Sequence, residues 1–127
     1  MTRQTSIPTV LIVEDEYPIA FAIKSILSDA GYHIIGPVGT VSEAIDLIAQ
    51  TDNLDAAVLD PNLRGEIASK VAQSLTDRDI PFVLVSGYSR HELARWSLNA
   101  ELIEKPILDN RLLNSLEKLI PREQRAV

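Results

Sequence analysis

The sequence predicts an α/β domain in which a parallel sheet is covered by helices on both faces. Two apolar runs without alternation, residues 9–13 (TVLIV) and 56–59 (AAVL), are typical of strands buried on both faces. Segments of helical periodicity separate these runs from later ones, with short connections. No repeat or linker interrupts the pattern, so we expect one domain over residues 1–127, with a core from about 8 to 120 between short flexible tails.

The first half of the chain is expected to contain three strands and two helices. The strand at 9–13 leads into a helix from about Tyr17, which Gly31 ends. A short strand at 32–35 is expected to close at Gly36-Pro37. Thr40 and Glu43 form a capping box that opens the second helix. The apolar stripe of that helix is Val41, Ala44, Ile45 and Ile48, and the strand at 56–59 follows it.

The second half continues the alternation. Ile67, Val71 and Leu75 recur every four residues, which predicts a third helix after Gly65. A fourth strand spans residues 80–85, and a helix from Arg90 to about Leu98 has only a thin apolar stripe. A fifth strand covers 101–104. The last helix is predicted from the apolar face of Leu112, Leu113, Leu116, Leu119 and Ile120, with Pro121 stopping it.

Polar residues stand where four of these strands end. They are Glu14 and Asp15 after the first strand, Asp60 after the third, Ser86 after the fourth and Lys105 after the fifth. Because the carboxyl ends of parallel strands share one edge of a sheet, we expect these side chains to lie together. Asp60 alone could equally be a helix cap, and only the whole set favours a site.

A cluster of three carboxylates repels itself and requires a cation unless some of its members are protonated. Oxygen ligands without His or Cys favour a hard ion, so we expect Mg²⁺. With part of the charge neutralised, a carboxylate can attack phosphorus and form an aspartyl-phosphate. Lys105 and the Ser86 hydroxyl would then stabilise the phosphoryl oxygens.

This constellation resembles the receiver domain of bacterial response regulators, over essentially the whole chain. The resemblance implies a flavodoxin-like fold with strand order 2-1-3-4-5. It also implies that Asp60 is the phosphoacceptor and that Asp15, Asp60, Glu14 (largely through water) and the Asn62 carbonyl bind Mg²⁺. Residues 81–88 (PFVLVSGY) are similar to a subgroup with a Pro-Phe-x-x-x-Thr-Gly-Tyr pattern that is rich in stand-alone receivers. The Lys105–Pro106 bond is expected to be cis.

Three positions depart from the family pattern. Pro61 follows the phosphoacceptor, Gly87 replaces the usual alanine, and Leu102 stands where most receivers carry a switch Tyr or Phe. The remaining candidates are less informative. We interpret His33 and His91 as surface or structural residues, and Trp96 as half-buried filler rather than a partner-facing anchor.

Composition excludes several classes of function. With no cysteine, a net charge of −6 and no long apolar run, the chain is expected to be cytoplasmic and to bind neither nucleic acid nor membrane. We therefore expect a monomeric or weakly dimeric signalling protein that takes a phosphoryl group from a sensor histidine kinase and binds an unknown downstream protein. One alternative is an interaction module that works without phosphorylation. A second is an aspartyl-phosphate phosphatase, which the absence of an acid at Asn62 disfavours. We expect that the protein is not an enzyme, apart from its own phosphorylation and dephosphorylation.

Overall fold

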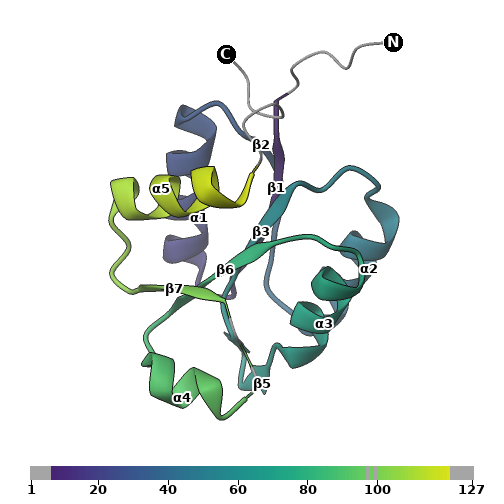
Figure 1. The fold of residues 1–127 in the computed structure, drawn as a ribbon, viewed down its shortest axis with the longest axis vertical. Coiled ribbons are helices and arrows are strands. Elements are labelled where there is room, and N and C mark those ends of the chain that lie inside the picture. Colours follow the sequence, from purple (N-terminus) through teal and green to yellow (C-terminus); the bar gives the residue numbers. More distant parts are fainter. Residues whose placement is uncertain (1–6, 97, 99, 121–127) are drawn as a thin grey trace.

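The computed structural model describes residues 7–96, 98 and 100–120. A five-stranded parallel sheet is formed, in spatial order, by β2 (His33–Val38), β1 (Thr9–Val13), β3 (Ala56–Leu59), β6 (Phe82–Ser86) and β7 (Glu101–Glu104). Counting only the strands of this sheet, the order is the predicted 2-1-3-4-5. Helices α1 (Tyr17–Asp29) and α5 (Asp109–Leu119) cover one face, and α2 (Val41–Gln50) and α3 (Ser69–Asp77) cover the other (Figure 1). The predicted doubly wound α/β fold is confirmed.

The core has two halves because neighbouring residues of a strand face opposite sides of the sheet. Val10 and Ile12 of β1 pack with Ile23 of α1 and Leu116 of α5. Leu11 and Val13 face the other half of the core, with the buried residues of α2 and α3. Burial on both faces explains why the strands appear in the sequence as unbroken apolar runs. Among the described residues, no helix has the length and apolar character needed to cross a membrane.

The second strand is longer than predicted. It continues through Gly36 and Pro37 to Val38, and the pairing with β1 shifts register between Leu11 and Val13. Gly36 has φ +91, and a Cβ there would lie 2.8 Å from the Ile12 carbonyl oxygen. Proline is tolerated because β2 is an edge strand. The peptide bond between Gly36 and Pro37 is cis, as is the predicted one between Lys105 and Pro106.

The segment after Asp60 folds differently from the prediction. Ile67 belongs not to the third helix but to β5 (Glu66–Ile67), which pairs antiparallel with β4 (Asn62–Leu63). The tip of this hairpin, Arg64 (φ 53) and Gly65 (φ 87), has the positive φ angles that a tight two-residue turn requires. The third helix therefore begins only at Ser69.

The bounds of some later elements also differ from the predictions. Helix α4 (Arg90–Ala94) opens with a capping box between Ser89 and Glu92, but it ends short of the expected Leu98. Only Leu93 anchors it in the core, so little favours its extension. Strand β6 starts at Phe82 rather than Ile80 and includes Ser86. In α2, Ile45 of the predicted apolar stripe is only half-buried. Helix α5 ends at Leu119, whereas the predicted stop, Pro121, lies outside the described residues.

Candidate functional site

The carboxyl edge of the sheet contains a polar cleft of about 460 Å³. Its lining is drawn from four strand ends and the β4–β5 hairpin. The residues are Asp15, Glu16, Asp60, Asn62, Gly65, Ser86, Gly87, Tyr88 and Lys105. The structure thus brings the predicted Asp15, Asp60, Asn62, Ser86 and Lys105 together in one cleft. Glu14 does not line the cleft but lies buried beside it.

Asp60 is the centre of the hydrogen-bond network. Its backbone N–H donates to the Val13 carbonyl at 2.9 Å, which extends the pairing of β3 with β1 by one residue. Its Oδ1 accepts the backbone N–H of Asn62 at 2.9 Å, and its Oδ2 accepts Lys105 Nζ, also at 2.9 Å. The carboxylate is therefore oriented at both oxygens although it is almost completely buried.

Lys105 links three carboxylates. Its Nζ lies 2.8 Å from Glu16 Oε1, 2.9 Å from Asp60 Oδ2 and 3.1 Å from Glu14 Oε1. Burial alone would lower the pKa of Lys105, but the bonds to Glu16 and Asp60 and the nearby negative charges outweigh it and raise that pKa. Lys105 is therefore a fixed positive charge beside Asp60.

Glu14 is the most perturbed acid of the site. Its side chain is only 1% exposed, and Oε2 accepts the backbone N–H of Glu16 at 3.1 Å. Burial raises the pKa of Glu14 to about 8, with the Asp60 carboxylate adding to the rise. Oε1 has no hydrogen-bond partner among the described residues, although Lys105 is near. A buried, unsatisfied acceptor among acids is a position suited to a bound cation.

The set of oxygen ligands is one that a hard divalent ion prefers. Carboxylate oxygens of Glu14, Asp15, Glu16 and Asp60 all lie within 4.8 Å of one another. The hairpin orients Asp15, whose Oδ2 accepts the Arg64 backbone N–H at 2.9 Å. Four carboxyl groups around a single ammonium leave excess negative charge, which a Mg²⁺-sized ion would neutralise. Glu14 would lose its proton in such a state.

Ser86 and Tyr88 form the opposite wall of the cleft. Ser86 Oγ accepts the Tyr88 backbone N–H at 2.8 Å, so its own proton remains available to donate. Tyr88 Oη accepts from Asn62 Nδ2 at 3.0 Å. The Tyr88 ring stands edge-to-face against the half-buried Trp96, with centroids 5.0 Å apart. Trp96 is therefore half-buried and packed against Tyr88, as interpreted, and both histidines are exposed.

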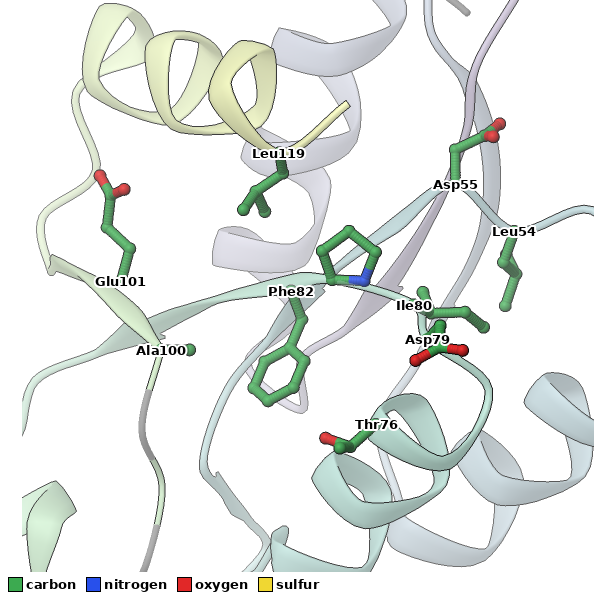
Figure 2. A pocket seen from close by; sticks show the side chains of 10 residues that line it. Leu54, Asp55, Thr76, Asp79, Ile80, Phe82, Ala100, Glu101 and Leu119 are labelled. Carbon is green, nitrogen blue, oxygen red and sulfur yellow. The ribbon is translucent and has the colours of Figure 1, made fainter. Parts of the chain in front are cut away.

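A hollow larger than the polar cleft lies elsewhere on the described surface. It has a volume of about 730 Å³ and opens at the amino ends of β3, β6 and β7, around Phe82 and Leu119 (Figure 2). Two of its acids are already engaged, since Asp55 accepts the Thr9 backbone N–H and Glu101 accepts the Ser115 hydroxyl. The smaller polar cleft, not this hollow, concentrates groups capable of chemistry.

The sequence reasoning missed two contributors to the site. Glu16 directly follows the predicted pair Glu14 and Asp15 but is not among the predicted cleft residues, and its partner Lys105 is 89 residues away in the chain. The backbone of Arg64 reaches Asp15 only because the hairpin forms. Neither contact has a signal in local sequence pattern.

Comparison with known proteins settles the family. The family model described as the response regulator receiver domain matches residues 10–117 of the sequence. The chain belongs to the response regulator receiver family. The receiver fold and the two-component class of signalling protein, both implied by the resemblance, are thereby confirmed.

Several family members are similar in sequence or structure. SdrG from Sphingomonas melonis Fr1 is 34% identical, with a TM-score of 0.74 over 89% of this chain and 96% of that one. The receiver domain of sensor histidine kinase PA1611 from Pseudomonas aeruginosa PAO1, whose active site cleft coordinates magnesium, is 16% identical with a TM-score of 0.76 over 90% and 98%. The transcriptional regulatory protein PdtaR of Mycobacterium tuberculosis is 26% identical over 89% of this chain, which spans 57% of that protein.

Proposed function

We propose that this receiver domain accepts a phosphoryl group on Asp60 in a Mg²⁺-dependent reaction and signals by binding other proteins. The observation that carries the proposal is the contact of Lys105 Nζ with Asp60 Oδ2 at 2.9 Å, inside a cleft that also holds Asp15 and Ser86. A buried, oriented carboxylate beside a fixed cation is suited to attack phosphorus.

In the proposed step an Asp60 oxygen forms a bond to phosphorus, and the bond from phosphorus to the donor breaks. The donor's leaving atom, an acetate oxygen or a kinase histidine nitrogen, keeps the electron pair. Lys105 would pair with one phosphoryl oxygen, and the free proton of Ser86 would donate to another. Hydrolysis later replaces the Asp60–phosphorus bond with one from water and releases phosphate.

Asp15, Glu14, Asp60 and the Asn62 carbonyl are the residues that would hold Mg²⁺. Support comes from the unsatisfied Glu14 Oε1, from the all-oxygen cluster and, by analogy, from the magnesium in the PA1611 receiver domain. A bound Mg²⁺ ion would supply charge neutralisation for the phosphoryl oxygens. Glu16 is a further carboxylate in reach of this cluster.

We infer no turnover of an external substrate. An aspartyl-phosphate phosphatase needs an acid two residues after the nucleophile, and that position is Asn62. Its amide is already engaged, since Oδ1 accepts the Gly65 N–H and Nδ2 donates to Tyr88. Self-phosphorylation and self-dephosphorylation are the reactions that we assign.

Incubation with Mg²⁺ and acetyl phosphate, followed by intact mass measurement, tests the proposal. We expect one added phosphoryl group that is lost with hydroxylamine, as an acyl phosphate should be. Asp60→Asn and a sample with EDTA in place of Mg²⁺ should gain none. Labelling of Asp60→Asn equal to that of the wild type would contradict the assignment and favour an interaction module that does not use Asp60.

A further inference from the structure

Glu16 is a carboxylate at the open side of the cleft to which the proposed phosphoryl chemistry assigns no role. Its side chain is 57% exposed, and it lines the cleft together with Asp60. Glu16 occupies the N-cap position of α1, yet its side chain makes no capping hydrogen bond. Helix capping therefore does not account for where this carboxylate lies.

The contact between Glu16 and Lys105 is the shortest of the three that Lys105 makes, at 2.8 Å. An ammonium group has three protons, and three carboxylates surround this one. Only two of its protons are donated in hydrogen bonds, to Glu16 and Asp60, so a phosphoryl group that pairs with Lys105 competes with Glu16 for the same ammonium. Glu14 is buried and Asp60 carries the incoming group, so the exposed contact with Glu16 is the one that exchanges.

The negative charge of Glu16 also disfavours the binding of a free phosphodonor. A phosphodonor that enters the cleft brings its negative charge next to the Glu16 carboxylate. Repulsion between like charges grows with the charge of the donor and is weakened by salt. Loss of the contact between Glu16 and Lys105 and repulsion by the Glu16 carboxylate both raise the free-energy cost of binding a free dianion, and the repulsion is weaker for a monoanion.

We propose that Glu16 is a specificity-determining residue that holds Lys105 in the unphosphorylated protein and disfavours free dianionic phosphodonors. The proposal rests on the assignment of Asp60 as phosphoacceptor. A donor delivered by a docked protein has additional contacts that offset the cost, whereas a small molecule does not. Glu16 would thus limit accidental phosphorylation by small metabolites of the acyl-phosphate class.

The test compares wild type with Glu16→Gln, which keeps the shape and loses the charge. Asp46→Asn, on the exposed side of α2, is a control that removes one negative charge away from the cleft. At saturating Mg²⁺ and pH 7, KM and kcat for labelling are measured with acetyl phosphate, a dianion, and with phosphoramidate, a monoanion. We expect Glu16→Gln to lower KM for acetyl phosphate roughly threefold to tenfold, with little change in kcat.

Three further results are expected: the KM effect should be smaller for phosphoramidate, should shrink in high salt and should be absent in Asp46→Asn. An unchanged or higher KM for acetyl phosphate in Glu16→Gln would overturn the proposal. An equal gain with both donors would also overturn it, because discrimination by charge would be missing. Failure of every variant to be labelled would instead reject Asp60 as the acceptor.

A measurement without any phosphodonor separates the two proposals further. The Lys105 ammonium group should give an observable ¹H–¹⁵N signal in the unphosphorylated protein, because ion pairing slows exchange of its protons with water. Lys105→Arg assigns the signal, and Glu16→Gln should weaken it. A signal of unchanged intensity would show that Glu16 does not hold Lys105, while labelling of Asp60 would be unaffected.

Discussion

Glu14 has a pKa of about 8 in the folded protein against 4.5 for the ordinary carboxyl group, chiefly because it is buried. Between these two values the folded state binds a proton that the unfolded state has lost. The stability that this proton contributes is fully present below pH 4.5 and is lost as pH rises through about 8. Deprotonated Glu14 is then a buried charge that the metal-free protein must tolerate.

We therefore predict that Glu14→Gln stabilises the metal-free protein more at pH 9 than at pH 5. Glutamine keeps the volume of the side chain and does not titrate. Urea unfolding in EDTA at pH 5, 7 and 9 measures the difference in the free energy of unfolding. A difference that is constant over this range would contradict the raised pKa. With Mg²⁺ added, the wild type should gain more stability at pH 9 than at pH 6, whereas Glu14→Gln should not.

Tyr88 is placed to shield a phosphoryl group on Asp60 from water, and the contributions of its ring and its hydroxyl can be tested separately. The side chain lines the cleft, and its Oη accepts from Asn62 at 3.0 Å. We predict that Tyr88→Ala loses its phosphoryl group several-fold faster, because water reaches phosphorus more easily. Tyr88→Phe keeps the ring and should lie closer to wild type. Phosphate release after removal of the donor gives the rates, and an equal or slower rate in Tyr88→Ala would refute shielding.

At the scale of elements, the sequence predicted the strands better than the short connections. Runs such as Ala56–Leu59 have apolar residues on both faces, so burial alone specifies them. The β4–β5 hairpin has two residues per strand and depends on Arg64 in a left-handed conformation, which sequence pattern does not favour for arginine. Most of the cleft residues could be predicted because they stand at the ends of predictable strands. The position of the Glu16 side chain could not, because it depends on a partner from a distant strand.

Helix α4 is the element in which we expect a response to phosphorylation. Leu102 is buried and has no ring to rotate, so a switch at that position has little differential contact to exploit. Ser86 and Tyr88, by contrast, connect the cleft to Trp96 and the short α4. Hydrogen exchange with and without beryllofluoride and Mg²⁺ should change mainly in residues 86–96. Changes confined to β7 and α5 would rule this out.

Arg78 couples α2 to the end of α3. Its guanidinium donates to the Ile48 carbonyl and, at 3.2 Å, to the Thr51 carbonyl, so it satisfies acceptors at the end of α2. We predict that Arg78→Ala lowers the free energy of unfolding by about 1–2 kcal/mol. Arg111→Ala, which removes the same charge from the exposed side of α5, should cost less than about 0.5 kcal/mol. Urea titration compares the two, and equal losses would show that charge, not capping, is responsible.

At the scale of the whole molecule, α1 presents an exposed aromatic pair near the cleft. Tyr17 is 70% and Phe21 52% exposed, and their rings stand edge-to-face with centroids 5.2 Å apart. Phe21 lies away from the buried residues of α1, and Tyr17 joins it one turn earlier. An exposed aromatic pair is typical of a surface that contacts a partner.

We predict that Phe21→Ala slows phosphoryl transfer from a histidine kinase that phosphorylates the wild-type chain, because we expect the kinase to dock over this pair. Labelling by acetyl phosphate should be unchanged, since the cleft residues are untouched. Leu108→Ala removes an equally exposed apolar side chain before α5 and serves as the control. Equal losses with both donors would point to misfolding, and no loss with the kinase would place docking elsewhere.

The course of β2 also bears on how the molecule behaves at high concentration. An outer strand with a regular row of free amides invites a strand from another copy, which is one route to fibres and precipitates. Here the outer strand contains Gly36 and Pro37, its pairing with β1 is irregular, and proline has no amide hydrogen to offer. Growth of the sheet by templated addition is therefore disfavoured on this flank, and the same residues that lengthen β2 help to keep neighbouring molecules apart.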